Sequence, residues 1–423
     1  MLGSLREVKD ARVIFLDMNS FFASVEQQYR PELRDHPLAV VSHDAPRGTV
    51  LAASYAAKAF GVKTGTRLGD ARMMCPGLAV TETTPGLYKE VHYKFMDILR
   101  DRCGPEVFAK SIDEAAIFLS PNWADSETAW EVARDIKERF RNELGEYIKC
   151  SIGIAPNSLL GKVASNLQKP DGLTEINLAN LEEVLGRLEL TDLPGIATRN
   201  AARLALIGIS TPLDLYSSTP EFLQANLGIF GRYWWWRLHG YEADPGEERL
   251  IKNMSHQHVL THWLYDFEAV WPIISRMADR LVHRLRRNGL RCRSVWLYLR
   301  LSGAASLSAE IKLDSPCDSY PALLGALRQM LEAFPRPLLG AIRQVSMGFN
   351  GLSITDGLQL DLFQQRPRHE QISKALEDIR GHYGFQAIQM GNVVRLDKKV
   401  AKEELGFGRL KDRNPSLVSK GLT

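Results

Sequence analysis

Cysteine is scarce in this sequence, with five residues in a chain of 423. Their number is odd and no pair has Cys-x-x-Cys spacing, which argues against a disulfide framework and against a zinc ribbon. Long apolar runs are missing too, because no stretch approaches the roughly 18 residues of a membrane-spanning helix. The first ten residues, MLGSLREVKD, contain no apolar segment typical of a signal peptide. We therefore expect a cytoplasmic protein that does not enter a membrane.

A clear excess of one charge is also lacking, since 53 Lys and Arg residues stand against 50 Asp and Glu residues. The distribution is nevertheless uneven: residues 1–250 carry a net charge of −6 and residues 251–423 a net charge of +9. An acidic half joined to a basic half favours a catalytic part beside a part that binds a polyanion such as nucleic acid. Internal repeats are absent, and the length predicts about two to four domains.

The periodicity of apolar residues predicts an α+β protein with several domains. In the first half we expect strands over 13–16, 106–111, 115–119 and 149–155, and helices over 127–144 and 158–168. Short helices follow up to about residue 240, and the polar stretch 241–250 is typical of a linker. In the second half we expect helices over 268–288 and 320–334, and strands over 294–301, 306–313 and 341–349. We interpret the chain beyond Gly351 as a partly ordered tail.

Three carboxylates lie at the ends of predicted strands. Asp17 follows an apolar strand, and Asp113 and Glu114 lie in a tight connection between two others. A buried acid is costly unless it is paired or binds a metal, and acids at adjacent strand ends can share two divalent ions. The same three acids could instead cap turns, or could belong to a nucleotide cyclase, a nuclease or a phosphatase. The trio alone does not decide between these alternatives.

Five sequence motifs narrow the choice. LDMNSFFASVEQ (16–27), SYAAKAFGVKTG (54–65), KSIDEAAIFL (110–119), SIGIAPNSLLGKVASNLQKPDGL (151–173) and LPGI (193–196) occur in this order. Together they closely resemble the Y-family (DinB/UmuC-type) translesion DNA polymerases, from about Val13 to Phe349. LQKPDGL and SYAAKAFGVK favour the DinB type, whereas the overall length and an internal QLDLF are typical of the UmuC type, so the sequence does not separate the two.

The resemblance implies a right-hand polymerase fold with an added α+β little-finger domain. It places the palm and fingers in 1–175, with the fingers at about 21–84, and a helical thumb with a helix-hairpin-helix in 176–245. A linker at 246–251, the little finger at 252–350 and a tail at 351–423 complete the chain. The implied function is low-fidelity DNA synthesis past lesions on a primer–template with deoxynucleoside triphosphates (dNTPs). A homologue that binds DNA without catalysis is the alternative, but such proteins lose metal-binding acids, and all three acids remain here.

The resemblance also assigns roles to individual residues. It makes Asp17, Asp113 and Glu114 catalytic, and it makes these acids and the Met18 carbonyl the ligands of two Mg²⁺ ions, with Mn²⁺ as a substitute. Phe22 falls where the family places a steric gate against the ribose 2′-hydroxyl, with Phe21 as its buried neighbour. The residues that fall where the family grips the incoming triphosphate are Tyr55, Lys58 and Lys169.

Four positions depart from the pattern of the family. Lys58 stands where many members carry Arg, so that a point charge replaces a bidentate fork. Ala52 replaces a small hydroxyl residue, Asn166 replaces the usual Asp, and Ala197 replaces the second glycine of the LPGIG turn. None of the four is a metal-binding acid, so they bear on nucleotide affinity more than on activity.

Candidate DNA contacts lie in both halves of the chain. Gly195 is in a turn whose backbone N–H groups could hold a phosphate. Arg276, Arg280, Arg284, Arg287 and Arg291 form a cationic stripe on the predicted helix, which we interpret as a solvated outer face. In the resembled family the little finger meets DNA mostly through its sheet, which favours Arg291, Arg293 and Arg300. We interpret Trp234, Trp235 and Trp236 as packing residues, because three adjacent side chains cannot share one helix face.

A short peptide after the little finger suggests a protein partner. Gln359, Leu360, Asp361, Leu362 and Phe363 resemble the QLxLF peptide by which bacterial polymerases bind the sliding clamp. Leu and Phe anchors on an extended segment suit a hydrophobic cleft, although such a segment could also pack on its own domain. Accessory mutagenesis subunits remain open as further partners, and the sequence assigns no role to residues 367–423.

Overall fold

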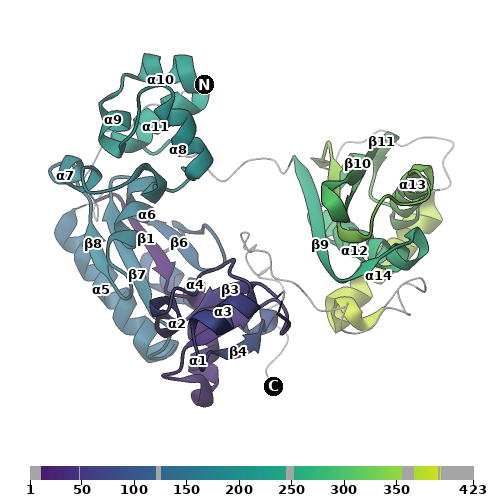
Figure 1. Cartoon of the computed structure of the whole chain (residues 1–423), viewed down its shortest axis with the longest axis horizontal. Coiled ribbons are helices and arrows are strands. Elements are labelled where there is room, and N and C mark those ends of the chain that lie inside the picture. The colour runs from purple at the N-terminus through teal and green to yellow at the C-terminus, as the bar shows by residue number, and fades with distance from the viewer. Residues whose placement is uncertain are drawn as a thin grey trace. The chain divides into compact units, whose positions relative to one another are not determined.

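The computed structural model describes residues 11–46, 48–120, 125–243, 252–354, 366–388 and 391. They form two compact units that divide between Pro245 and Gly246 (Figure 1). Each unit contains at least one sheet and its own apolar core. Within these described ranges, no helix is both long enough and apolar enough to cross a lipid bilayer.

A five-stranded sheet forms the centre of the first unit, in the order β5-β6-β1-β7-β8. The central strand β1 pairs antiparallel with β6 on one side and with β7 on the other. All of its residues are buried, as expected for an apolar strand covered on both faces. The strands are β1 (Val13–Met18), β5 (Val107–Ala109), β6 (Glu114–Phe118), β7 (Cys150–Ala155) and β8 (Leu173–Glu175). The four strands predicted in this half are confirmed, and β8 is an addition.

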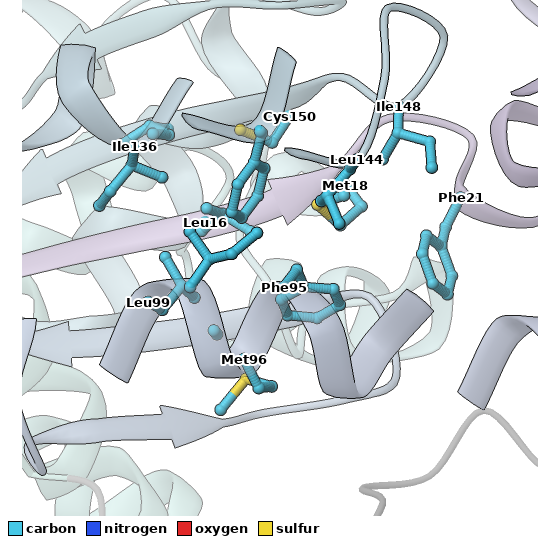
Figure 2. Close-up of a cluster of buried hydrophobic side chains, with 14 of the residues drawn as sticks. Leu16, Met18, Phe21, Phe95, Met96, Leu99, Ile136, Leu144, Ile148 and Cys150 are labelled. Carbon is cyan, nitrogen blue, oxygen red and sulfur yellow. The ribbon is translucent and has the colours of Figure 1, made fainter. Parts of the chain in front are cut away.

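Helices cover both faces of this sheet. Successive side chains of β1 point to opposite faces, so this strand packs against helices on both sides. Leu16 and Met18 join a core to which α4 contributes Phe95 and α5 contributes Ile136 (Figure 2). Phe15 points the other way, toward α6. The three helices are α4 (Pro85–Cys103), α5 (Ser126–Glu143) and α6 (Ser158–Leu167), and the predicted helices over 127–144 and 158–168 are confirmed.

A smaller sheet in the same unit has the order β3-β2-β4 and a separate apolar core. Strand β2 pairs antiparallel with β3 and parallel with β4. Helix α1 begins three residues after β1 and leads the chain toward this sheet. The elements here are α1 (Phe21–Tyr29), η1 (Pro31–Leu33), β2 (Leu38–Val41), β3 (Val50–Ala53), α2 (Tyr55–Ala59), α3 (Leu68–Met74) and β4 (Ala79–Glu82).

Short helices complete the first unit and share an apolar core with α6. Trp236 is buried, and Trp234 and Trp235 pack against this core, which confirms that the tryptophan triplet serves in packing. The helices are α7 (Leu181–Leu185), η2 (Leu190–Asp192), α8 (Thr198–Ala205), α9 (Pro212–Ser217), α10 (Pro220–Leu227) and α11 (Ile229–Leu238).

The second unit contains an antiparallel sheet in the order β11-β10-β12-β9, with the short β13 paired to β10. Helices α12 and α13 pack against one face. The elements are β9 (Asn253–Leu264), α12 (Phe267–Arg287), β10 (Leu290–Leu301), η3 (Ser302–Ala304), β11 (Ser306–Cys317), α13 (Tyr320–Ala333), β12 (Ile342–Asn350) and β13 (Ser353–Ile354). The predicted elements are confirmed, and β9, a polar strand rich in histidine, was missed.

The tail contains more structure than the sequence suggested. Helix α14 (Arg366–Tyr383) and the turn η4 (Phe385–Ala387) belong to the second unit. Both terminal nitrogens of Arg380 donate hydrogen bonds to the buried carboxylate of Asp279 on α12, at 2.9 and 2.7 Å. The Arg380 guanidinium also lies 4.4 Å from the centre of the Phe385 ring. The end of α14 is thus anchored to the second unit by a buried ion pair.

Candidate active site

The pairing of β1 with β6 brings the predicted acids to one end of the sheet. Asp17 lies directly opposite Glu114 across this antiparallel pair. The backbone N–H of Met18 donates a hydrogen bond to the carbonyl oxygen of Asp113, at 2.9 Å. Two segments that are almost 100 residues apart in the sequence therefore meet through backbone hydrogen bonds, and the three carboxylates share one edge.

The face on which Asp17 lies follows from strand alternation. Leu16 and Met18 point into the core with α4 and α5, so Asp17 points with Phe15 toward α6. Helix α6 lies very close to β1 and β7, because glycines occupy the contact. A Cβ added at Gly161 would lie 2.9 Å from the Cβ of Phe15, and one added at Gly153 would lie 2.1 Å from the carbonyl oxygen of Gly161.

This close approach places Lys162 of α6 beside the acids at the end of β1. The sequence reasoning missed this residue. Its ammonium group contacts both the Asp17 and the Glu114 carboxylates, and it lies 5.5 Å from the centre of the Phe15 ring. Burial opposes the charge, but the two carboxylates outweigh it and raise the pKa of Lys162. A signal was present in the sequence, because Lys162 belongs to the same motif (151–173) as Lys169. Lys169 also pairs with Asp17, at 2.8 Å.

Asn19 is a second residue that the sequence reasoning missed. Its side-chain oxygen accepts a hydrogen bond from the backbone N–H of Asp171, at 2.7 Å, and its amide nitrogen donates to Ser151. Lys137 holds the same loop by donating to the backbone carbonyl of Asp171, at 2.8 Å. The segment that carries Lys169 is therefore tied to the end of β1.

A cavity of 310 Å³ opens at this edge of the sheet. It brings together residues from β1, α1, the β3–α2 segment, the β5–β6 connection and the loop after α6. Seven of the predicted site residues line it: Asp17, Met18, Phe22, Tyr55, Lys58, Asp113 and Lys169. Glu114 is not part of the lining and is instead linked to Asp17 through Lys162. The cavity thus combines carboxylates with cationic and hydroxyl donors, as a site for a metal-bound polyphosphate requires.

Partial burial perturbs the titration of these groups. Burial, and secondarily the charge of Asp17, raise the pKa of Tyr55 to about 12, so its hydroxyl remains a hydrogen-bond donor. Burial and the neighbouring charge of Lys169 lower the pKa of Lys58, while Asp17 acts in the opposite direction. The Lys58 ammonium lies 4.4 Å from the centre of the Tyr55 ring. Burial also raises the pKa of Asp113, against the hydrogen bond that Ser111 donates to it.

The carboxylates fit divalent metal ions in their chemistry. Their oxygens and the Met18 carbonyl are the hard donors that Mg²⁺ and Mn²⁺ prefer. The ammonium of Lys162, held by Asp17 and Glu114, shows that a cation is accommodated between these two side chains. Among the described residues, no group of three His, Cys, Asp or Glu side chains is arranged to hold a metal as it stands.

Phe21 and Phe22 are both buried, each with 3% of its surface exposed. The expectation that Phe21 alone would be buried is therefore wrong. Phe22 stacks on Tyr88 with ring centres 4.3 Å apart and an interplanar angle of 12°, and it still lines the cavity with Asp17. Phe22 is therefore shielded from solvent by the Tyr88 ring of α4 and still borders the cavity.

The four departures from the family pattern occupy different places. Lys58 and Ala52 line the cavity, so both are placed to affect nucleotide affinity. Asn166 is exposed near the end of α6. Ala197 precedes α8 and supplies no side-chain cap.

The predicted DNA contacts are divided between the two units. Gly195 has a φ of +101° in the turn between η2 and α8, a conformation that favours glycine. Arg293 and Arg300 are exposed on β10. Arg291 differs, because its guanidinium is largely buried and lies 3.6 Å from the Asp318 carboxylate.

The cationic stripe needs one correction. Helix α12 ends at Arg287, and Gly289 with a φ of +60° reverses the chain before β10. Arg291 is therefore on a strand, and the stripe of the helix ends before it. The clamp-binding-like residues Gln359, Leu360, Leu362 and Phe363 lie outside the described residues.

Comparisons with known proteins agree on one family. Residues 16–166 match the impB/mucB/samB family, and residues 251–362 match the C-terminal domain of that family. A DNA polymerase IV of Moorella thermoacetica is 32% identical over 384 residues, which cover 90% of this chain and 95% of the relative. A DNA polymerase IV of Bacillus velezensis is 30% identical over 402 residues, which cover 92% and 94%.

Solved structures share the fold. The Y-family DNA polymerase chimera Dbh-Dpo4(243-245)-Dbh matches with a TM-score of 0.69 at 23% identity, over 81% of this chain and 99% of that one. DinB from Sulfolobus solfataricus matches with a TM-score of 0.54 at 24% identity, over the same shares. The predicted α+β polymerase fold with palm and little finger is confirmed, and the helix-hairpin-helix stays a prediction.

The relatives settle two alternatives that the sequence had left open. Those named above are DNA polymerases IV, which favours the DinB type over the UmuC type. The non-catalytic alternative is not favoured, because these relatives are polymerases and all three acids are present at one sheet edge. Membership also implies dependence on divalent metal ions and the use of primer–template DNA and dNTPs. The chain belongs to the impB/mucB/samB family and is a Y-family translesion DNA polymerase of the DinB type.

Proposed function

We propose that Asp17, Asp113, Glu114 and the Met18 carbonyl bind two Mg²⁺ ions, which Mn²⁺ replaces, for nucleotidyl transfer. When bound, the ions would activate the primer 3′-hydroxyl and neutralise the triphosphate. Asp17 and Met18 are held at the C-terminal end of β1. The hydrogen bond from the Met18 backbone N–H to the Asp113 carbonyl oxygen holds the β5–β6 connection, which carries Asp113, beside them. Lys162 offsets the negative charge of Asp17 and Glu114 before the metal ions bind.

The triphosphate is held by Tyr55, Lys58 and Lys169. The single observation that carries this proposal is that all three residues line one cavity with Asp17 and Asp113, although Tyr55 and Lys58 come from α2 and Lys169 comes from the loop after α6. Cationic and hydroxyl donors around developing phosphate charge stabilise the transition state of in-line transfer. Burial raises the pKa of Tyr55 and lowers that of Lys58, and perturbed pKa values of this kind are typical of functional sites, which supports the proposal.

Lys58 gives a direct test of the triphosphate site. Lys58→Ala is expected to raise the nucleotide KM by about tenfold or more, because it removes one cation from the phosphates. Lys58→Arg is expected to leave the KM unchanged or to lower it, since the guanidinium keeps the positive charge and can donate two parallel hydrogen bonds to a phosphate. Steady-state primer extension with a range of dNTP concentrations measures both effects.

Lys63→Ala serves as the matched control, because Lys63 is exposed on the segment after α2 and does not line the cavity. Its KM is expected to be unchanged. An equal KM for Lys58→Ala and the unaltered chain would place the Lys58 charge outside the nucleotide site.

Primer–template DNA is proposed to contact both units. The backbone N–H groups of the turn at Gly195 would hold a phosphate. Arg293 and Arg300 are exposed on β10 and would bind phosphates as well, whereas Arg291 is engaged with Asp318. We also propose a cytoplasmic location, because it would place the chain with its DNA substrate.

A sliding clamp is the proposed protein partner, through Gln359, Leu360, Leu362 and Phe363. Replacing Leu362 and Phe363 with Ala is expected to leave basal primer extension intact and to remove its stimulation by an added bacterial clamp, because these side chains are the anchors of such peptides. Loss of basal extension instead would mean that the segment packs on its own domain. Accessory mutagenesis subunits would be sought by comparing extension with and without a cell extract.

A further inference from the structure

A cation outside the cavity contacts the loop that carries Lys169. Lys137 lies on α5 next to Ile136, which packs in the core with Cys150 (Figure 2). The Lys137 side chain is 21% exposed, and it does not line the cavity that contains Asp17. It contacts the end of the loop after α6, so any effect of Lys137 on the cavity passes through that loop.

The Lys137 ammonium group is surrounded by backbone carbonyls and one carboxylate. It donates hydrogen bonds to the carbonyl oxygens of Asp171 at 2.8 Å, Cys150 at 3.1 Å and Gly172 at 3.3 Å. It also forms an ion pair with the Asp171 carboxylate. A lysine ammonium has three N–H donors and no acceptor, so these four acceptors use its full donor capacity.

These contacts join the loop to the strand beside β1. Cys150 is the first residue of β7 and is the partner of Met18 in the β1–β7 pairing. The same ammonium group therefore connects α5, the start of β7 and the loop at Asp171. A shift of the loop relative to the end of β1 would break hydrogen bonds in a partly buried place, where lost partners are costly.

The loop has an unusual backbone conformation at this point. Asp171 has a φ of +60°, which few residues other than Gly, Asn and Asp adopt. Its backbone N–H donates to the Asn19 side chain at 2.7 Å, and the N–H of Gly172 donates to Ser151 at 3.2 Å. Together with Lys137, these bonds hold Asp171 through both its N–H and its carbonyl group.

Lys169 lies two residues before this anchored point. Its ammonium group pairs with Asp17 at 2.8 Å and lines the cavity. A lysine side chain has many rotamers, and a loose loop would add backbone freedom to them. Because an ordered loop loses less entropy when it binds a ligand, the contacts of Lys137 favour phosphate binding by Lys169.

We propose that Lys137 is a positioning residue for nucleotide binding, which holds residues 169–172 in the place where Lys169 meets the triphosphate. This inference rests on the proposed function, because it requires Lys169 to bind the triphosphate. It goes beyond that function by extending the nucleotide site to a residue of α5 that does not line the cavity.

The first test is the nucleotide KM of Lys137→Met, which keeps an unbranched side chain and removes the charge. Steady-state primer extension is expected to show a KM about fivefold higher, with kcat and primer–template affinity within about twofold. Lys137→Arg keeps the charge and several donors, and it is expected to restore most of the loss. Lys137→Gln keeps N–H donors without the charge and replaces Lys137→Met if that variant does not fold.

Arg141→Ala is the matched control, because Arg141 is an exposed cation one turn later on α5. Its KM is expected to be unchanged. A readout without nucleotide is hydrogen exchange of the Asp171 and Gly172 amides, measured by mass spectrometry on peptides that contain them. Exchange at both amides is expected to be faster in Lys137→Met. An unchanged KM or unchanged exchange in that variant would overturn the proposal.

A double-mutant cycle with Lys169→Ala separates positioning from general stabilisation. Lys169→Ala alone is expected to raise the KM about tenfold or more, and the addition of Lys137→Met is expected to change it by less than about twofold. A full further rise in the double variant would overturn the proposal, because Lys137 would then act without Lys169. An unchanged KM for Lys169→Ala alone would overturn the triphosphate role of Lys169 and the positioning role with it.

Discussion

Asp17→Ala and Asp113→Ala are each expected to abolish primer extension while primer–template affinity stays within a few-fold of that of the unaltered chain. Both carboxylates line the same cavity, and the proposed mechanism needs both to hold the metal ions. The proposed DNA contacts, Gly195, Arg293 and Arg300, lie elsewhere and remain. Extension of a labelled primer on undamaged and abasic templates measures activity, and anisotropy with the same DNA measures affinity. The unaltered chain is expected to extend the primer on both templates.

Two further variants serve as controls, one for the shape of the Asp17 side chain and one for the loss of an acid outside the cavity. Asp17→Asn keeps the shape of the side chain while it removes the charge, and it is expected to be as inactive as the alanine variant. Asp70→Ala removes an exposed acid in the first turn of α3 and is expected to be fully active. More than a few per cent of residual activity in Asp17→Ala or Asp113→Ala would rule out the two-metal assignment.

Phe22→Ala is expected to raise ribonucleotide incorporation by orders of magnitude. Phe22 lines the cavity with Asp17, and its stacking on Tyr88 holds the ring in one position. A ribonucleotide differs from a deoxyribonucleotide by one added hydroxyl, and a site rejects an added group by a clash rather than by attraction. Loss of the ring opens that space. The ratio of kcat/KM values for matched ribo- and deoxyribonucleotides measures the change.

Phe21→Ala is the comparison for this effect. Phe21 packs against the rings of Tyr88 and Phe95, and its removal is expected to cost about 3 kcal/mol of stability as a core deletion. Because Phe22 is equally buried, Phe22→Ala is expected to lose stability too, so sugar selection is the readout that separates the two. If Phe21→Ala changes sugar selection and Phe22→Ala does not, the gate is Phe21.

The sequence was informative where local patterns determine the structure. The apolar run before Asp17 placed this residue at the end of a buried strand, and the motifs around Asp113 and Tyr55 were enough to predict that both lie near it, as the shared cavity shows. Lys162 was missed because its reach depends on the close contact of Gly153 and Gly161, which only the folded chain brings together. The burial of Phe22 likewise depends on Tyr88, more than 60 residues away along the chain.

Other errors came from the limits of periodicity. The cationic stripe was extended beyond Arg287 because Arg291 has the same helical spacing as the arginines before it. Gly289, with a positive φ, instead reverses the chain between the two residues. Strand β9 is polar and shows no apolar alternation, so its pairing with β12 could not be read from its own residues. The tail looked weakly ordered because polar contacts to α12 anchor it, from Arg380 to Asp279 and from Glu377 to His283, rather than an apolar stripe.

That pair has a consequence for how the protein is made. Asp279 leaves the ribosome 101 residues before Arg380, the residue that neutralises it. Until then, the nascent domain must bury an unpaired carboxylate or remain open at α12, and a missing partner costs about 3–5 kcal/mol. The little finger therefore reaches its final stability only when translation has passed the clamp-binding-like peptide. A gene truncated just after that peptide would encode a domain in which Asp279 lacks Arg380, rather than a shortened but intact polymerase.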